Sequence, residues 1–168
     1  ITAGTYTIGV LFRALVEGEL IKIFGRIKVQ KQVSELKNHF IICGFGRIGR
    51  IVCSELNDDK IRFVIIEQDP TVIEHIEAQK YLYLDMDATT EEALEQAGIM
   101  KAKGIVTAVN SDANNVFITM TAKSLRPDVF VLARASEEKN EAKLFRAGAT
   151  RVVSPYLIGG RRIAQMLK

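Results

Sequence analysis

Cysteine and histidine are scarce in this chain of 168 residues, which has two of each. Two cysteines are too few for a disulfide framework. Cys43 and Cys53 both lie among apolar residues, which favours buried free thiols in a reducing compartment. His39 and His75 are isolated from them, and we interpret each as an ordinary surface or strand-edge residue. No Cys and His cluster has the spacing of a zinc site, so we expect no metal.

The sequence also lacks an apolar run of the length that a full membrane span needs, about 20 residues. Residues 1–16 are apolar but shorter, and no basic segment precedes them as one would in a signal peptide. The net charge of +3 gives no reason to expect a nucleic-acid partner. An apolar fraction of 48% and a charged fraction of 26% are ordinary for a globular domain.

The first 38 residues have two interpretations. Residues 1–16 are either a surface helix or added sequence, or they are the cytoplasmic half of a membrane helix. In the second case Arg13, Glu17 and Glu19 mark its exit from lipid, because charge at bilayer depth is costly. Residues 20–36 then have apolar residues at near-helical spacing with lysine and arginine between them. Such a segment is typical either of the cytoplasmic side of a membrane or of a solvated helix packed on a domain.

A glycine motif at residues 44–49 follows the apolar run Phe40–Cys43 and precedes an apolar-periodic segment. This pattern predicts a buried strand, a tight turn and the first turn of a helix. In a dinucleotide-binding fold, Gly44 makes the turn, Gly46 lets a diphosphate approach the backbone, and Gly49 lets the helix pack closely on the strand. The free N–H groups of that helix then face an anion.

Short apolar strands alternate with helical segments through the rest of the chain. The alternation predicts an α/β fold, a Rossmann-like doubly wound sheet of six parallel strands preceded by an N-terminal helix. We expect the remaining strands at residues 61–66, 81–84, 104–109, 129–133 and 150–153. The ligand is expected beside the carboxyl end of the first strand.

Helix starts are marked by capping residues. Asp69-Pro70 and Thr90 are expected to begin two helices, and Ser111 or Asp112 a third. Ser136 is expected to cap a helix ending at Gly148, and Ser154-Pro155 to begin the last one. We interpret Phe117 and Met120, in the third of these helices, as core residues.

Glu67 ends the second strand, 18 residues after Gly49. A carboxylate at this place accepts hydrogen bonds from ribose hydroxyls and repels a 2′-phosphate. It is followed by Gln68 and Asp69, not by an arginine. The sequence therefore favours NAD(H) or an adenine nucleotide such as ADP or ATP over NADP.

The candidate cofactor-binding residues lie on the glycine loop and at the ends of the strands. Arg47 and Arg50 stand in the first helical turn, where a cation opposes the helix dipole, and contact with phosphate would offset that cost. Arg134 could also reach a phosphate. The complete candidate set is Gly44, Phe45, Gly46, Arg47, Ile48, Gly49, Arg50, Glu67, Gln68, Asp87, Ala88, Asn110 and Arg134.

Catalytic groups are missing from the predicted binding edge. A hydride-transfer enzyme usually needs a proton donor and a substrate pocket, often in a second domain. Neither histidine follows the fourth or a later strand, and no Ser-x-x-x-Lys pair appears there. This pattern favours a binding module with no catalytic residues.

These motifs together resemble the N-terminal lobe of an RCK (regulator of K⁺ conductance, or TrkA-N/KTN) domain. The matching segments run from His39 to the C-terminus, and the first 37 residues resemble the end of a potassium-channel inner helix with its linker. The segments are Ile-Ile-Cys-Gly-Phe-Gly-Arg-Ile-Gly-Arg at 41–50, Val-Ile-Ile-Glu at 64–67, Asp-Met-Asp-Ala-Thr at 85–89, Ala-Arg-Ala at 133–135, Ala-Gly-Ala at 147–149 and Val-Val-Ser-Pro-Tyr-Leu-Ile-Gly-Gly-Arg-Arg-Ile-Ala at 152–164.

The resemblance implies residues 1–19 as part of a pore-lining helix, 20–38 as a linker and 39–168 as the nucleotide-binding lobe. It implies a ligand-sensing domain on the cytoplasmic side of the cell inner membrane, regulating a pore that conducts potassium ions. Family members form dimers that build a tetrameric channel or an octameric gating ring, through helices placed here at about 111–125 and 137–147. In that case Phe117 and Met120 face a neighbouring subunit.

Two departures from the family pattern bear on the ligand and on chain length. The pore's selectivity filter and the family's second lobe are absent from this sequence, and we expect both in a longer chain. Calcium-gated members carry carboxylates where this chain has Ala108, Arg134 and Ser136, so a nucleotide is the expected ligand. The alternatives are a regulatory subunit of a potassium transporter and an NAD-dependent oxidoreductase.

Overall fold

The computed structural model describes the backbone of residues 2–168, and the side chains from Val16 onward except those of Glu17, Glu19 and Lys22. It contains one six-stranded sheet in which every paired neighbour is parallel, in the order β3-β2-β1-β4-β5-β6. The predicted Rossmann-like fold class is confirmed. The strands are β1 (Phe40–Cys43), β2 (Phe63–Glu67), β3 (Tyr83–Asp85), β4 (Gly104–Thr107), β5 (Phe130–Arg134) and β6 (Arg151–Val153).

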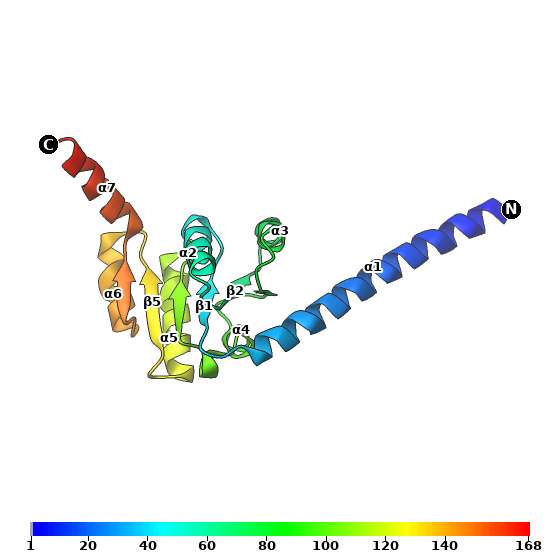
Figure 1. The fold of residues 1–168 in the computed structure, drawn as a ribbon, viewed down its shortest axis with the longest axis horizontal. Coiled ribbons are helices and arrows are strands. Elements are labelled where there is room, and N and C mark those ends of the chain that lie inside the picture. Colours follow the sequence, from blue (N-terminus) through cyan, green and yellow to red (C-terminus); the bar gives the residue numbers. More distant parts are fainter. Residues whose placement is uncertain (1) are drawn as a thin grey trace.

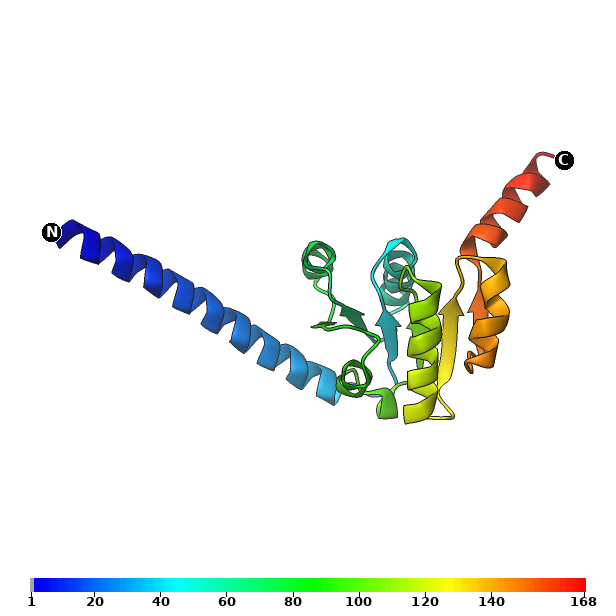
Figure 2. The same cartoon turned by 180° about the vertical axis from the view of Figure 1, so that it is seen from behind.

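Helices cover both faces of this sheet (Figures 1 and 2). Helices α2 (Arg47–Asp58) and α3 (Pro70–Ala78) pack on one face around Ile42, Ile65 and Cys53. Helices α4 (Glu91–Gln96) and α5 (Asp112–Leu125) pack on the other, and α6 (Glu141–Arg146) covers β5 and β6. Two short 3₁₀ turns, η1 (Ile99–Lys101) and η2 (Glu138–Asn140), complete the connections.

Helix α1 (Thr2–Glu35) projects from the lobe as a long rod (Figure 1). Its C-terminal end is attached to the core by Val33, which is 1% exposed, and by Val29 and Leu36 packed beside it. The helix continues without a break across the predicted boundary at residues 19 and 20. The side chains of Arg13, Glu17 and Glu19, which we expect at the edge of the lipid, lie outside the described residues. Among the described residues no helix combines the length and the hydropathy needed to cross a bilayer.

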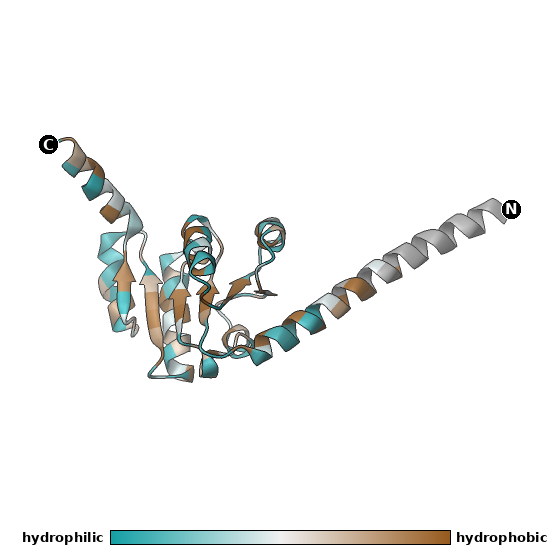
Figure 3. Ribbon diagram, viewed as in Figure 1, coloured by the Kyte–Doolittle hydropathy of each residue, from teal (hydrophilic) through white to brown (hydrophobic). Residues whose placement is uncertain are grey.

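The hydropathy of α1 differs from that of the lobe. Figure 3 shows apolar and polar residues mixed along the part of the helix that is nearer the lobe, whereas apolar residues dominate the strands. Phe24, Ile21 and Ile27 are between 57% and 72% exposed on this helix.

Most predicted helix starts are confirmed. The side chains of Asp69, Thr90 and Ser111 accept hydrogen bonds from backbone N–H groups in the first turns of α3, α4 and α5. The prediction for Ser136 is wrong, because the segment first forms η2 and α6 then begins at Glu141 without a side-chain cap. The backbone N–H of Ser136 instead donates to Asp112 at 2.8 Å.

Three residues predicted from local pattern have different burial in the structure. His39, the residue before β1, is fully buried and is not a surface residue, because its ring packs inside the lobe with Nε2 2.8 Å from the carbonyl oxygen of Ala97. Phe117 and Met120 are each 56% exposed, so the expectation that they belong to the core is wrong. The buried face of α5 is formed by Asn115, Ile118, Thr119 and Ala122.

Candidate nucleotide site

The glycine loop joins β1 to α2 with the geometry that its sequence predicts. Gly44 has φ = +95°, in the left-handed region that favours glycine. A Cβ on Gly49 would lie 2.2 Å from the carbonyl oxygen of Gly44, so no side chain fits there. Gly46 is the N-cap of α2 and makes no side-chain cap, which leaves the first N–H groups of the helix available to an anion.

Glu67, at the end of β2, is held against this loop by three backbone donors. Its Oε2 accepts from the N–H of Phe45 at 2.9 Å, and its Oε1 accepts from Gln68 at 2.9 Å and Asp69 at 3.0 Å. Each carboxylate oxygen has two lone pairs, so Oε1 is satisfied and Oε2 has one acceptor position left. A single further donor, such as a hydroxyl, can therefore bind at Oε2.

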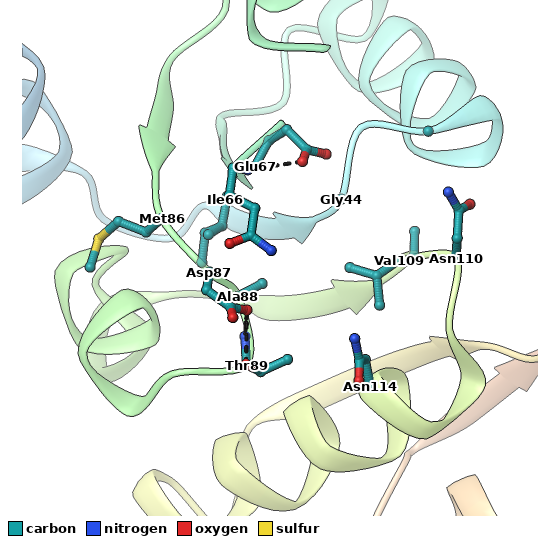
Figure 4. A pocket seen from close by; sticks show the side chains of 13 residues that line it. Gly44, Ile66, Glu67, Met86, Asp87, Ala88, Thr89, Val109, Asn110 and Asn114 are labelled. Atoms are coloured by element: carbon teal, nitrogen blue, oxygen red, sulfur yellow. Dashed lines mark hydrogen bonds between the residues drawn. The ribbon is translucent and has the colours of Figure 1, made fainter. Parts of the chain in front are cut away.

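A first cavity of about 160 Å³ opens among the carboxyl ends of β1, β2, β3 and β4. In Figure 4, side chains from three strand ends, Glu67, Asp87 and Asn110, surround this opening. Hydrogen bonds fix the side chain of Asp87 in the cavity lining, because its Oδ1 accepts from the N–H and the hydroxyl of Thr89 at 2.9 and 2.8 Å. The lining is Gly44, Gly46, Ile66, Glu67, Gln68, Met86, Asp87, Ala88, Thr89, Ala108, Val109, Asn110 and Asn114.

A second cavity, of about 510 Å³, continues from the first, since Gly46 and Asn110 line both. Its wall carries three arginines, Arg47, Arg50 and Arg134, together with Ser136 and Tyr156. None of its lining residues, all within the described part of the chain, is acidic. The two cavities thus differ in electrostatic character, with carboxylates in the first and guanidinium groups in the second.

Arg134 is 7% exposed, and a buried cation requires compensation. Its Nη1 donates to the carbonyl of Val109 at 3.3 Å and to Asn110 Oδ1 at 3.5 Å, while its Nε has no partner. A guanidinium group has five N–H donors, so most of the capacity of Arg134 remains free. Arg134 lines the second cavity, so its guanidinium group can donate to an anion bound there.

Asn115 connects the ends of β4 and β5, where both cavities lie. Its Nδ2 donates at 3.0 Å to the carbonyls of Val109 and Arg134, and its Oδ1 accepts from the N–H of Val109. Asp112 holds the following loop through the N–H groups of Ser136 and Glu137. Burial alone would raise the pKa of Asp112, but hydrogen bonds from Asn140 and from this loop outweigh it and lower the pKa.

The thiols beside the site are poor nucleophiles. Burial raises the pKa of Cys43 and that of Cys53 to about 12, so both remain protonated at neutral pH. Both pack in the core, Cys53 between the sheet and α2 and Cys43 on the opposite face of the sheet.

A comparison with protein families identifies the fold. The model for the TrkA-N domain matches residues 40–155, which begin at β1 and end at the first residue of α7 (Pro155–Met166). The chain belongs to the TrkA-N domain family. This confirms the predicted resemblance.

Relatives of this TrkA-N domain include membrane channels. Potassium channel protein 1 of Methanocaldococcus jannaschii is 40% identical over 166 residues, which are 98% of this chain and 50% of that protein. The chain therefore spans about half the length of this relative.

Among solved structures, the GsuK channel bound to NAD superimposes with a TM-score of 0.69 at 31% identity, over 79% of this chain and 23% of that one. GsuK bound to ADP gives a TM-score of 0.69 at 30% identity, over 91% and 43%.

Ten of the thirteen predicted site residues of the TrkA-N domain line one of the two cavities. The other three residues support the loop and do not line a cavity. Phe45 is buried, Ile48 packs against the core, and Gly49 allows α2 to lie close to the backbone of Gly44. Sequence reasoning missed eight lining residues, of which Thr89, Asn114, Ser136 and Tyr156 are polar. Tyr156 lies 109 positions from its contact Arg47, so no local pattern could indicate the pairing.

Proposed function

We propose that this lobe binds an adenine nucleotide, NAD(H) or ADP/ATP, as a non-catalytic ligand. The observation that carries the proposal is the position of the α2 N-terminus, whose N-cap Gly46 lines both the carboxylate-bearing cavity and the arginine-lined cavity. A nucleotide has the same asymmetry, with hydroxyls and an uncharged base at one end and phosphates at the other. GsuK, with the same fold, has been solved with NAD and with ADP.

Each cavity would take a different part of the ligand. The first cavity, of about 160 Å³, is below the size of a usual ligand pocket, about 300–1,000 Å³. The second extends it past Gly46. Adenosine therefore lies in the first cavity with a ribose hydroxyl on Glu67 Oε2, and Gln68, Asp87 and Ala88 lie along its edge. The phosphates run past Gly46 toward the arginines, where charge-assisted hydrogen bonds are strongest.

The ligand acts as a signal in this proposal, in the cytoplasmic regulatory part of an inner-membrane potassium channel. Residues 1–19 belong to a pore-lining helix, 20–38 form the linker and 39–168 the sensing lobe. The match to the Methanocaldococcus jannaschii channel protein supports this, because it extends over 98% of the chain and so includes most of α1. A nucleotide then shifts the gate through its different affinity for the open and closed states.

A second copy of the chain is the proposed partner of the exposed apolar side chains on α5 and α6. Phe117 and Met120 are 56% exposed and Phe145 is 51% exposed. Such dimers would assemble into the tetrameric channel or octameric ring, through whose pore potassium passes. A transporter subunit and an oxidoreductase are less favoured, since the similarity to a channel protein continues through α1.

Calorimetry with NAD⁺, NADH, ADP and ATP tests the proposal. We expect saturable binding by the wild type and at least tenfold weaker binding by Glu67→Ala, which removes the ribose acceptor and frees the N–H of Phe45. Tyr83→Phe, outside both cavities, should bind as the wild type does. Equal affinity of Glu67→Ala and wild type would refute the site assignment. Sustained hydride transfer from NADH to a carbonyl substrate would refute the sensor role.

A further inference from the structure

Helix α7 projects away from the lobe (Figure 2), and its second residue, Tyr156, lines the arginine-lined cavity. All of α7 is described, and none of its side chains is buried. Its ion pair to the lobe, Arg161 with Glu138 at 3.6 Å, joins side chains that are 67% and 64% exposed, and such pairs contribute little. The direction of α7 therefore depends strongly on its first turn.

Tyr156, in that first turn, lies between two of the arginines. Its hydroxyl accepts a hydrogen bond of 2.5 Å from Arg47 Nη2. The guanidinium carbons of Arg47 and Arg134 each lie 5.7 Å from the centre of its ring, within the range of a cation–π contact. One side chain of α7 thus touches a cation from α2 and a cation from β5.

This arrangement favours a bound anion. It brings two positive groups to one ring, and the Nε of buried Arg134 has no partner. A phosphate in the same cavity would offset the repulsion and satisfy free donors of both arginines while leaving the bond from Arg47 to Tyr156 in place. The anion would then stabilise the conformation in which Tyr156 holds α7.

We propose that Tyr156 is a positioning residue that couples phosphate binding in the arginine-lined cavity to the orientation of α7. The inference rests on the proposed nucleotide binding and concerns the phosphates beyond the first. The first phosphate lies at Gly46, and the next one reaches the cavity where Arg47, Arg134 and Tyr156 meet. Because coupling is reciprocal, the ligand fixes α7 to the same extent that Tyr156 strengthens binding of that phosphate.

The test compares ADP with AMP in the wild type, Tyr156→Phe and Tyr156→Ala. Losing the hydroxyl should weaken ADP binding between about twofold and tenfold, the range of one net hydrogen bond, and Tyr156→Ala should weaken it further. AMP binding should change much less, because AMP has no second phosphate. Tyr83→Phe is the matched control, since it loses a phenol bond of the same length, 2.5 Å to Glu77, outside both cavities.

Hydrogen exchange of α7 gives the second measurement. ADP should slow exchange of residues 155–166 in the wild type, and in Tyr156→Ala it should slow exchange at the glycine loop only. Equal losses for AMP and ADP, or α7 exchange that ADP does not change, would overturn this inference and leave the proposed function standing. Absence of ADP binding by the wild type would also overturn this inference, and absence of binding by NAD⁺, NADH, ADP and ATP alike would overturn the proposed function.

Discussion

At the scale of single residues, the glycines of the loop separate into structural and ligand-facing positions. Gly49 has no room for a methyl group, because its Cβ would lie 2.2 Å from the carbonyl oxygen of Gly44. At Gly46 the nearest atom to a Cβ is Asn110 Oδ1 at 3.4 Å, and φ is −71°, which alanine adopts readily.

We therefore predict that Gly49→Ala lowers the free energy of unfolding by at least about 1–3 kcal/mol, the usual cost of overpacking. Gly46→Ala should change it by less than about 1 kcal/mol, the difference between glycine and alanine at an N-cap. Urea unfolding of the two variants measures both values. If the two variants have equal free energies of unfolding, the close contact between Gly49 of α2 and Gly44 does not contribute to stability, and this prediction is wrong.

The candidate site residues that could be predicted are those whose place follows from spacing along the sequence. Gly44, Gly46 and Glu67 were identified because their spacing follows from one strand-turn-helix unit and the next strand. Asn115 and Tyr156 were missed because their roles depend on strands and helices that meet only in the folded lobe. The unpartnered Nε of Arg134 likewise depends on burial, which the sequence does not show directly.

At the scale of helices and strands, the alternation of parallel strands with helices followed from periodicity, and the errors came from tertiary contacts that compete with local pattern. Ser136 has the residue type of a helix cap, but Asp112 of α5 takes its backbone N–H, so α6 starts five residues later. Strand β3 starts at Tyr83 rather than at Tyr81, whose ring packs edge-on against Phe45 and Phe63.

The junction of α1 with the lobe contains a buried titratable group. This group is His39. Two backbone hydrogen bonds hold the junction: the N–H of Lys103 donates to the carbonyl of His39 at 2.7 Å, and the N–H of Asn38 donates to the carbonyl of Lys101 at 2.9 Å. Burial lowers the pKa of His39 below 6.5; the hydrogen bond with Ala97 opposes this, and the positive charges of Arg62 and Lys101 add to it. Its Nδ1 has no partner. The folded protein therefore favours the neutral imidazole.

This predicts a loss of stability in acid. Below pH of about 6.5 the unfolded chain binds a proton at His39 that the folded chain does not, so the free energy of unfolding falls with a slope of at most about 1.4 kcal/mol per pH unit. Above that pH the contribution is complete. Urea unfolding at pH 7.5 and 5.5 measures it, with His39→Gln as the non-titrating control. A wild type and variant with the same pH dependence would contradict the assignment.

At the scale of the whole molecule, the exposed side chains of Phe117, Met120 and Phe145 predict self-association. We expect light scattering to give the wild type at least twice the chain mass of 18.7 kDa. Phe117→Asp should shift the particle toward one chain, because a carboxylate in an apolar interface is costly. Met100→Asp, at a side chain 67% exposed on η1, is the control. A monomeric wild type would contradict the proposed partner.

ADP calorimetry of one pair of variants tests whether a nucleotide phosphate binds where α2 begins, as we propose. Gly46→Asp places a carboxylate between the two cavities. Gly25→Asp makes the same change on α1, where no atom lies within 4 Å of the new Cβ. We expect Gly46→Asp to lose ADP binding while Gly25→Asp keeps wild-type affinity. Undiminished ADP affinity in Gly46→Asp would contradict phosphate binding at the start of α2.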